Sequence, residues 1–77
     1  MLSDLSLLHE GDSAVIQSIE ADEALHHRLQ ALGFQTGKPV SVVRLGRFRG
    51  PLQVRIGMTD VIIRRCDAAK IKVGPPL

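Results

Sequence analysis

Apolar residues recur along this chain with two different spacings, and the change between them marks its main structural boundary. Leu25, Leu29 and Leu32 lie four and three residues apart, the spacing that places side chains on one face of a helix. Asp22 offers an N-cap acceptor before them, and Glu23 places negative charge in the first turn. We therefore predict a helix that runs to about residue 32.

A glycine is predicted to end this helix. Gly33 can adopt the left-handed conformation at low steric cost, and Phe34 is placed to fold back on Leu29 as in a Schellman motif. Gly37 supplies a second turn, and from Val40 the apolar spacing becomes alternating. Structural roles are assigned to Leu25, Leu29, Leu32, Gly33, Phe34 and Gly37.

Five short segments have the composition of strands, at residues 14–19, 40–45, 52–56, 61–63 and 71–73. The first two break strict alternation, which predicts a bulge or bend in each. Residues 46–51 and 57–60 are predicted turns, and residues 66–69 a single helical turn. Residues 5–8 indicate a short helical or extended lead-in, and Gly74-Pro75-Pro76 predicts a loose end.

Bent strands with turn signals every few residues predict a mainly β fold. The first choice is a small, partly open five-stranded SH3-like barrel, with the α-helix inserted after the first strand and the helical turn before the last. An OB-like barrel is the alternative, although its strands are usually longer and its helix lies later in the chain. With 77 residues and no repeat or linker, residues 1–77 are expected to form a single domain.

The composition points to the cytoplasm. No apolar run approaches the roughly 20 residues that cross a bilayer, and the start of the chain lacks the pattern of a secretory signal. The lone Cys66 agrees with a reducing compartment, excludes a Cys-rich zinc framework, and is expected to be buried or half-buried.

The net charge of +2 conceals an uneven distribution. Residues 1–37 hold six acids and one base, whereas residues 38–77 hold nine bases and two acids. A basic sheet of this kind attracts nucleic acid, an anionic membrane surface or an acidic protein patch, and charge alone does not choose among them.

Several motifs in order resemble one family across nearly the whole chain. They read Arg28-Leu29-x-x-Leu32-Gly33-Phe34-x-x-Gly37-x-x-Val40, then Gly50-Pro51-Leu52-x-Val54, then Val61-Ile62-Ile63-Arg64, and then Asp67-Ala68-Ala69-x-Ile71-x-Val73. This order is similar to that of the FeoA family of small bacterial ferrous iron transport proteins, which often has Ala-Leu where this chain has Ile62-Ile63. The resemblance implies an SH3-like barrel and a cytosolic accessory protein for FeoB, a membrane transporter with a G-protein-like domain. A related SH3-like domain lies at the C-terminus of metal-dependent repressors.

The candidates for metal ligation are weak. His26 and His27 are adjacent on the predicted helix and point about 100° apart, so they do not chelate one ion together. Glu23 with His27, or Asp22 with His26, provides two ligands at most, fewer than a dedicated site needs. No metal site and no cofactor are therefore predicted, and iron is expected to be the cargo of the pathway.

Catalysis and nucleic-acid binding are less favoured than protein recognition. No nucleophile is paired with a histidine and a carboxylate, and no phosphate-binding loop is present, so a non-enzymatic protein is predicted. A basic nucleic-acid-binding barrel remains the alternative, although Phe48 is the single aromatic residue free to stack on bases. Protein recognition is favoured because Phe48 lies between two arginines at a glycine-bounded loop. The predicted contacts with the cytosolic part of FeoB are Arg47, Phe48, Arg49, Arg55 and Arg64.

Overall fold

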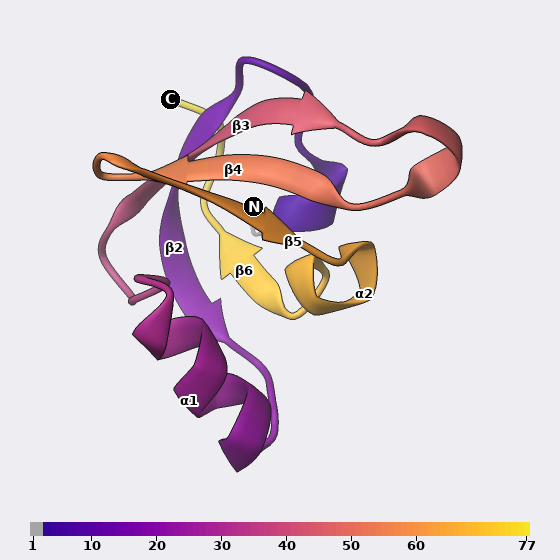
Figure 1. Ribbon diagram of the computed structural model, residues 1–77. Helices are drawn as coiled ribbons and strands as arrows, with labels where there is room; N and C mark the ends of the chain where they lie inside the picture. The colour runs from indigo at the N-terminus through magenta and orange to yellow at the C-terminus, as the bar shows by residue number, and fades with distance from the viewer. Residues whose placement is uncertain (1–2) are drawn as a thin grey trace.

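A single antiparallel sheet of six strands organises the protein, whose computed structural model describes residues 3–77 (Figure 1). The strand order is β1-β6-β2-β3-β4-β5. The bounds are β1 Ser3–Asp4, β2 Ser13–Ile19, β3 Pro39–Leu45, β4 Leu52–Ile56, β5 Thr59–Ile63 and β6 Ile71–Val73. The five predicted strands are confirmed, and the two-residue β1 joins them by pairing with β6.

Two irregular positions curl this sheet into a partly open barrel. In β2 the register with β6 shifts between Ile16 and Ser18, and in β3 the register with β4 shifts between Val42 and Arg44. An extra residue on one strand bends it and increases its twist, so β2 can pair with β6 at one end and with β3 at the other. The predicted bends are therefore confirmed, and the barrel stays open between β1 and β5.

Helix α1 (Glu23–Ala31) begins and ends as its sequence predicts. The side chain of Asp22 accepts a hydrogen bond from the Leu25 N–H at 2.8 Å. Gly33 has φ of +106°, and the Phe34 N–H donates to the Leu29 carbonyl at 3.0 Å. Together with the Gly33 N–H donating to the Gln30 carbonyl, this is the Schellman hydrogen-bond pair.

The core is aliphatic and contains one aromatic residue, Phe34, which is fully buried. Leu25 and Leu29 of α1 are buried with it, as predicted. Leu32 was predicted to share their face but is 45% exposed. The reason is that Leu32 caps the helix, so its side chain lies at the rim of the core.

The connections differ from expectation at three points. The β4–β5 turn contains two residues, Gly57 and Met58, so β5 begins earlier than predicted. Cys66 is exposed at the start of α2 (Arg65–Ala68), because that turn buries Ala68 instead. The segment after β6 was predicted to be loose, but it is hydrogen-bonded to β2. The Gly74 N–H donates to the Val15 carbonyl at 3.0 Å, and the Leu77 N–H donates to the Ser13 carbonyl.

Two short turns complete the fold, the 3₁₀ turn η1 (Leu5–Leu7) after β1 and the turn η2 (Arg47–Arg49) between β3 and β4, in which Phe48 and Arg49 have positive φ. The predicted lead-in is thus helical, with Leu5 fully buried. Within residues 3–77, no helix is long and apolar enough to cross a membrane.

Candidate functional site

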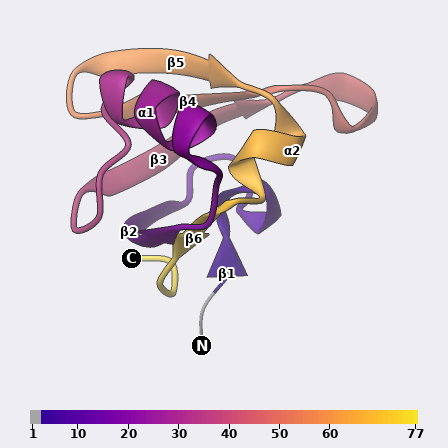
Figure 2. The ribbon, with the colours of Figure 1, turned by 90° about the horizontal axis from the view of Figure 1, so that it is seen from below.

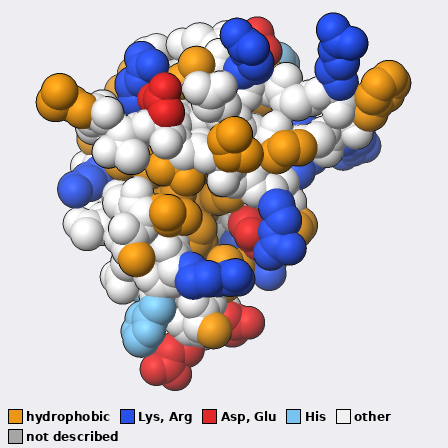
Figure 3. All heavy atoms as spheres, viewed as in Figure 1, with side chains coloured by type: hydrophobic (Ala, Val, Ile, Leu, Met, Phe, Trp, Pro, Cys, Tyr) orange, Lys and Arg blue, Asp and Glu red, His pale blue; other side chains and the backbone are white. Residues whose placement is uncertain are grey.

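The β3–β4 connection presents an exposed aromatic side chain at one end of the barrel. Phe48 is 98% exposed, and Arg47 and Arg49 on either side are also exposed. Apolar and basic side chains project together from this connection (Figure 3). Phe48 therefore points into solvent.

The conformation of this connection is unusual for its residues. Phe48 and Arg49 have φ of +55° and +60°, in the left-handed region that non-glycine residues seldom adopt. Its ends are tightly packed, because a Cβ on Gly46 would lie 2.6 Å from the Pro51 oxygen. A Cβ on Gly50 would lie 2.9 Å from the Arg47 oxygen. Glycines thus hold a closed loop that displays Phe48.

Two of the other predicted contact arginines already have carboxylate partners. Arg55 and Asp60 are opposite each other on β4 and β5, and Arg55 donates from Nε and Nη2 to the two carboxylate oxygens at 2.7 and 3.2 Å. These hydrogen bonds raise the pKa of Arg55 and lower the pKa of Asp60. Arg64 pairs with Asp67 at 3.2 Å on α2. Arg47 and Arg49 take part in no ion pair among the described residues.

The four weak metal candidates all lie at the first turns of α1 or its cap. Asp22 uses its carboxylate to cap the helix, as described above. Within residues 3–77, no group of three or more His, Cys, Asp or Glu side chains gathers in a way that could hold a metal ion. The candidates Glu23, His27, Asp22 and His26 thus offer at most the two-ligand pairs that their spacing allows.

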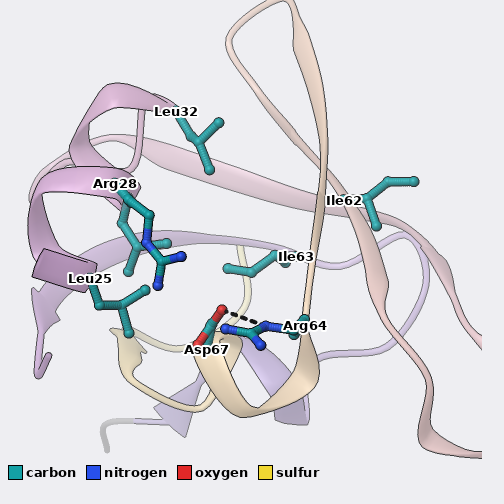
Figure 4. Close-up of a pocket in the computed structure, with 8 residues that line it drawn as sticks. Leu25, Arg28, Leu32, Ile62, Ile63, Arg64 and Asp67 are labelled. Carbon is teal, nitrogen blue, oxygen red and sulfur yellow. Dashed lines mark hydrogen bonds and ion pairs between the residues drawn. The ribbon is translucent and has the colours of Figure 1, made fainter.

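A hollow surface that the sequence did not indicate lies beside β5. One hollow, of about 240 Å³, separates α1 from the C-terminal part of β5 and α2, and Figure 4 shows Leu25, Arg28 and Ile63 around it. A second, of about 380 Å³, continues past Leu32 to the β4–β5 turn. We call the two hollows together the β5 trough. Its residues are Leu25, Arg28, Leu29, Leu32, Gly33, Lys38, Pro39, Ile56, Gly57, Thr59, Ile62, Ile63, Arg64 and Asp67.

The signal that could have revealed the trough is the position of Leu32. A leucine directly before the glycine of a Schellman motif is a cap residue, so it need not be buried with the helix interior. Here Leu32 is the residue shared by both hollows.

Comparison with known proteins places the chain in one family. The FeoA domain model matches residues 4–75. A fusion protein of Porphyromonas gingivalis, in which Fe(2+) transport protein A is joined to the Fe(2+) transporter FeoB, is 44% identical over 69 residues. That match covers 90% of this chain but 8% of the fusion protein, so the chain spans a small part of that relative.

Solved structures agree on the fold. The FeoA protein of Stenotrophomonas maltophilia, an SH3 domain protein solved in complex with zinc, superposes with a TM-score of 0.81 at 35% identity. The match covers 92% of this chain and 88% of that one. A manganese-dependent transcriptional repressor superposes with a TM-score of 0.84 at 21% identity, over 99% of this chain and 42% of the repressor, and shows the fold alone. With its SH3-like barrel and a family match over nearly its full length, the chain belongs to the FeoA domain family.

Proposed function

We propose that this chain is a non-enzymatic, cytosolic accessory protein of bacterial ferrous iron uptake that docks on the cytosolic part of a FeoB-type transporter. The observation that carries this proposal is the similarity to the FeoA part of a FeoA–FeoB fusion protein, at 44% identity over 90% of the chain. Two proteins joined in one polypeptide operate beside each other, so a domain of the same family is expected to meet such a transporter through a surface contact.

The Phe48 loop is the first proposed contact. An apolar ring that is 98% exposed gains most by entering a pocket on a partner, and flanking arginines orient it toward acidic side chains. Arg47 and Arg49 are available for this because neither is engaged in an ion pair in the described part of the chain. Arg55 and Arg64 are proposed as secondary contacts, since each must share its charge with Asp60 or Asp67.

Iron is proposed as the cargo of the transporter and not as a ligand of this chain. The Stenotrophomonas maltophilia relative was solved with zinc, but the His and acidic side chains near the start of α1 provide two ligands per pair here. Two ligands make a weak site, far from the three or four of a dedicated one.

The test is a titration of the chain against the purified cytosolic part of a FeoB-type transporter. Phe48→Ala is expected to weaken binding by about tenfold or more, the usual effect of removing a central aromatic anchor. Met58→Ala is the matched control, because Met58 is equally exposed but lies on the turn at the other end of the sheet (Figure 1). The double charge reversal Arg47→Glu with Arg49→Glu is expected to slow association and to reduce its salt dependence.

Two further arms of the titration address the alternatives. A random RNA pool tests the basic nucleic-acid-binding barrel, and ferrous iron tests a resident metal site. Binding of RNA with a steep salt dependence, without binding of the transporter part, would overturn the proposal. Tight binding of ferrous iron by a monomer would overturn the proposal that iron is not a ligand of this chain.

A further inference from the structure

The edge strand β5 carries backbone groups that no other part of the described structure uses. β5 pairs with β4 on one side and has no strand on the other. The two-residue turn makes Ile56 and Thr59 the closing pair, so Val54–Val61 and Leu52–Ile63 are the other hydrogen-bonded pairs of the ladder.

Because hydrogen-bonded and non-hydrogen-bonded pairs alternate along the β4–β5 ladder, every second residue of β5 has its backbone N–H and C=O on the side away from β4. The N–H and C=O of Asp60 and Ile62 point to the open edge, away from β4. Backbone hydrogen bonds from the other described elements do not reach them. An unpaired strand edge is a template for a further strand unless something covers it.

The first hollow of the β5 trough lies beside the C-terminal part of this edge strand, because Ile62, Ile63 and Arg64 line it. In this first hollow α1 forms one wall and β5 the other, a helix-and-strand arrangement in which an added strand can lie. The second hollow lies between the end of α1, the start of β3 and the β4–β5 turn. Apolar side chains are visible in the hollow between α1 and the sheet (Figure 3). Alternate side chains of a strand lie on one face, about 6.5–7 Å apart, so the side chains on the inner face of an added strand would point toward the hollows, which share Leu32.

Charge selects the kind of segment. Three bases line the trough, Arg28, Arg64 and Lys38, against the single acid Asp67. Asp67 already pairs with Arg64, whereas Arg28 and Lys38 form no ion pair within residues 3–77. Ile62 also lines the first hollow, is 71% exposed, and has a side chain that points away from α1 (Figure 4).

We propose that the trough receives an extended segment of the transporter partner, which adds to β5 as a further strand. The segment has apolar side chains at alternate positions and at least one carboxylate that reaches Arg28 or Lys38. Its backbone bonds to Asp60 and Ile62, and its outward residues cover Ile62. This inference rests on the proposed function and specifies a second contact, separate from the Phe48 loop.

A proline substitution tests the backbone contact. The Ile62 N–H is not part of the β4–β5 ladder, so Ile62→Pro removes an outward donor and leaves that ladder intact. The proline ring also obstructs a neighbouring strand. Ile62→Pro is expected to weaken binding of the transporter part at least about tenfold, whereas the control Ile62→Val, which keeps the N–H, is expected to stay within about twofold. Equal affinities for the two variants would overturn the inference.

Hydrogen exchange on the unmodified chain keeps the test decisive if the proline variant folds poorly. The amides of Asp60 and Ile62 are expected to exchange rapidly in the free protein and at least about tenfold more slowly in the complex. The amides of Thr59, Val61 and Ile63 face β4 and are protected in both states. Unchanged exchange at Asp60 and Ile62 in the complex would refute the added strand.

The charge requirement is tested by Arg28→Glu, which is expected to weaken binding severalfold more than the control Lys70→Glu, since Lys70 lines neither hollow. Equal effects of these two reversals would refute the acidic character of the segment.

The outcomes also separate the strand addition from the proposed docking function. If the transporter part binds and these variants have no effect, the docking function stands and the strand addition fails. If the unmodified chain does not bind it at all, the proposed function fails.

Discussion

Replacing Phe48 with glycine is expected to stabilise the fold while it removes the side chain that is proposed to dock. Phe48 is 98% exposed, so the folded state gains almost no apolar burial from it. Its φ of +55° costs a non-glycine residue about 1–2 kcal/mol. Glycine relieves that strain, but the larger conformational entropy of its unfolded state costs about 0.4–1 kcal/mol, which leaves a net gain of about 0.8 kcal/mol at the middle of these ranges.

Thermal unfolding followed by circular dichroism measures this gain. For a domain of this size it corresponds to a rise in Tm of about 2–8 °C. Phe48→Ala is the control, because alanine loses the ring but keeps the strain, and its Tm is expected to stay near that of the unmodified chain. Both variants lose the docking side chain and should bind the transporter part equally weakly. A Tm for Phe48→Gly at or below that of Phe48→Ala would refute the claim of stored strain.

Three other substitutions test the helix end, the core and the exposed ion pair. Gly33→Ala is expected to lower the free energy of unfolding by about 1–2 kcal/mol in urea titrations, because alanine is strained at a φ of +106°. The new Cβ would lie at an ordinary 3.6 Å from Ile56, so the cost comes from the backbone conformation and not from a clash. An unchanged urea midpoint would contradict this argument. Phe34→Ala is expected to cost about 3–5 kcal/mol of a total near 4–12 kcal/mol, and a native-like urea midpoint would show that the core does not depend on this ring. Arg55 lowers the pKa of Asp60 in the native state. The ion pair therefore stabilises the native state at pH values above the unfolded-state pKa of about 3.9, and this stabilisation is lost as the pH falls through the lower native-state pKa of Asp60. Asp60→Asn should therefore be less stable than the unmodified chain at neutral pH and equally stable near pH 2; a difference independent of pH would contradict this assignment.

Local signals were sufficient for much of the fold. The Schellman motif needs three residues close in sequence, Leu29, Gly33 and Phe34, and all three behave as their chemistry predicts. The bends in β2 and β3 were visible as breaks in alternation, because an extra residue shifts the apolar side chains to the other face.

Two features could not be predicted from local patterns, one because it depends on distant pairing and one because it depends on the exact length of a turn. β1 contains two residues and exists through its pairing of Ser3 with Val73, so no periodicity can reveal it. The Arg55–Asp60 pair follows from a two-residue turn, in which Gly57 adopts φ of +61°. A turn assigned to residues 57–60 conceals that pair, since Asp60 is then read as a turn residue and not as a strand residue.

The strand order determines where a linker to another domain can be attached without covering β5. β1 lies at one edge of the sheet and pairs with β6, while β5 lies at the other edge, on the far side of the barrel (Figure 2). A covalent linker attached beside β1 or after β6 would therefore leave β5 and the trough uncovered. A short flexible linker gives an effective concentration of about 1 mM, so even contacts with Kd of tens of micromolar would be almost fully occupied within one polypeptide. The same surface can thus serve a tethered domain through weak contacts, whereas a free chain must reach the same occupancy through its own affinity and abundance.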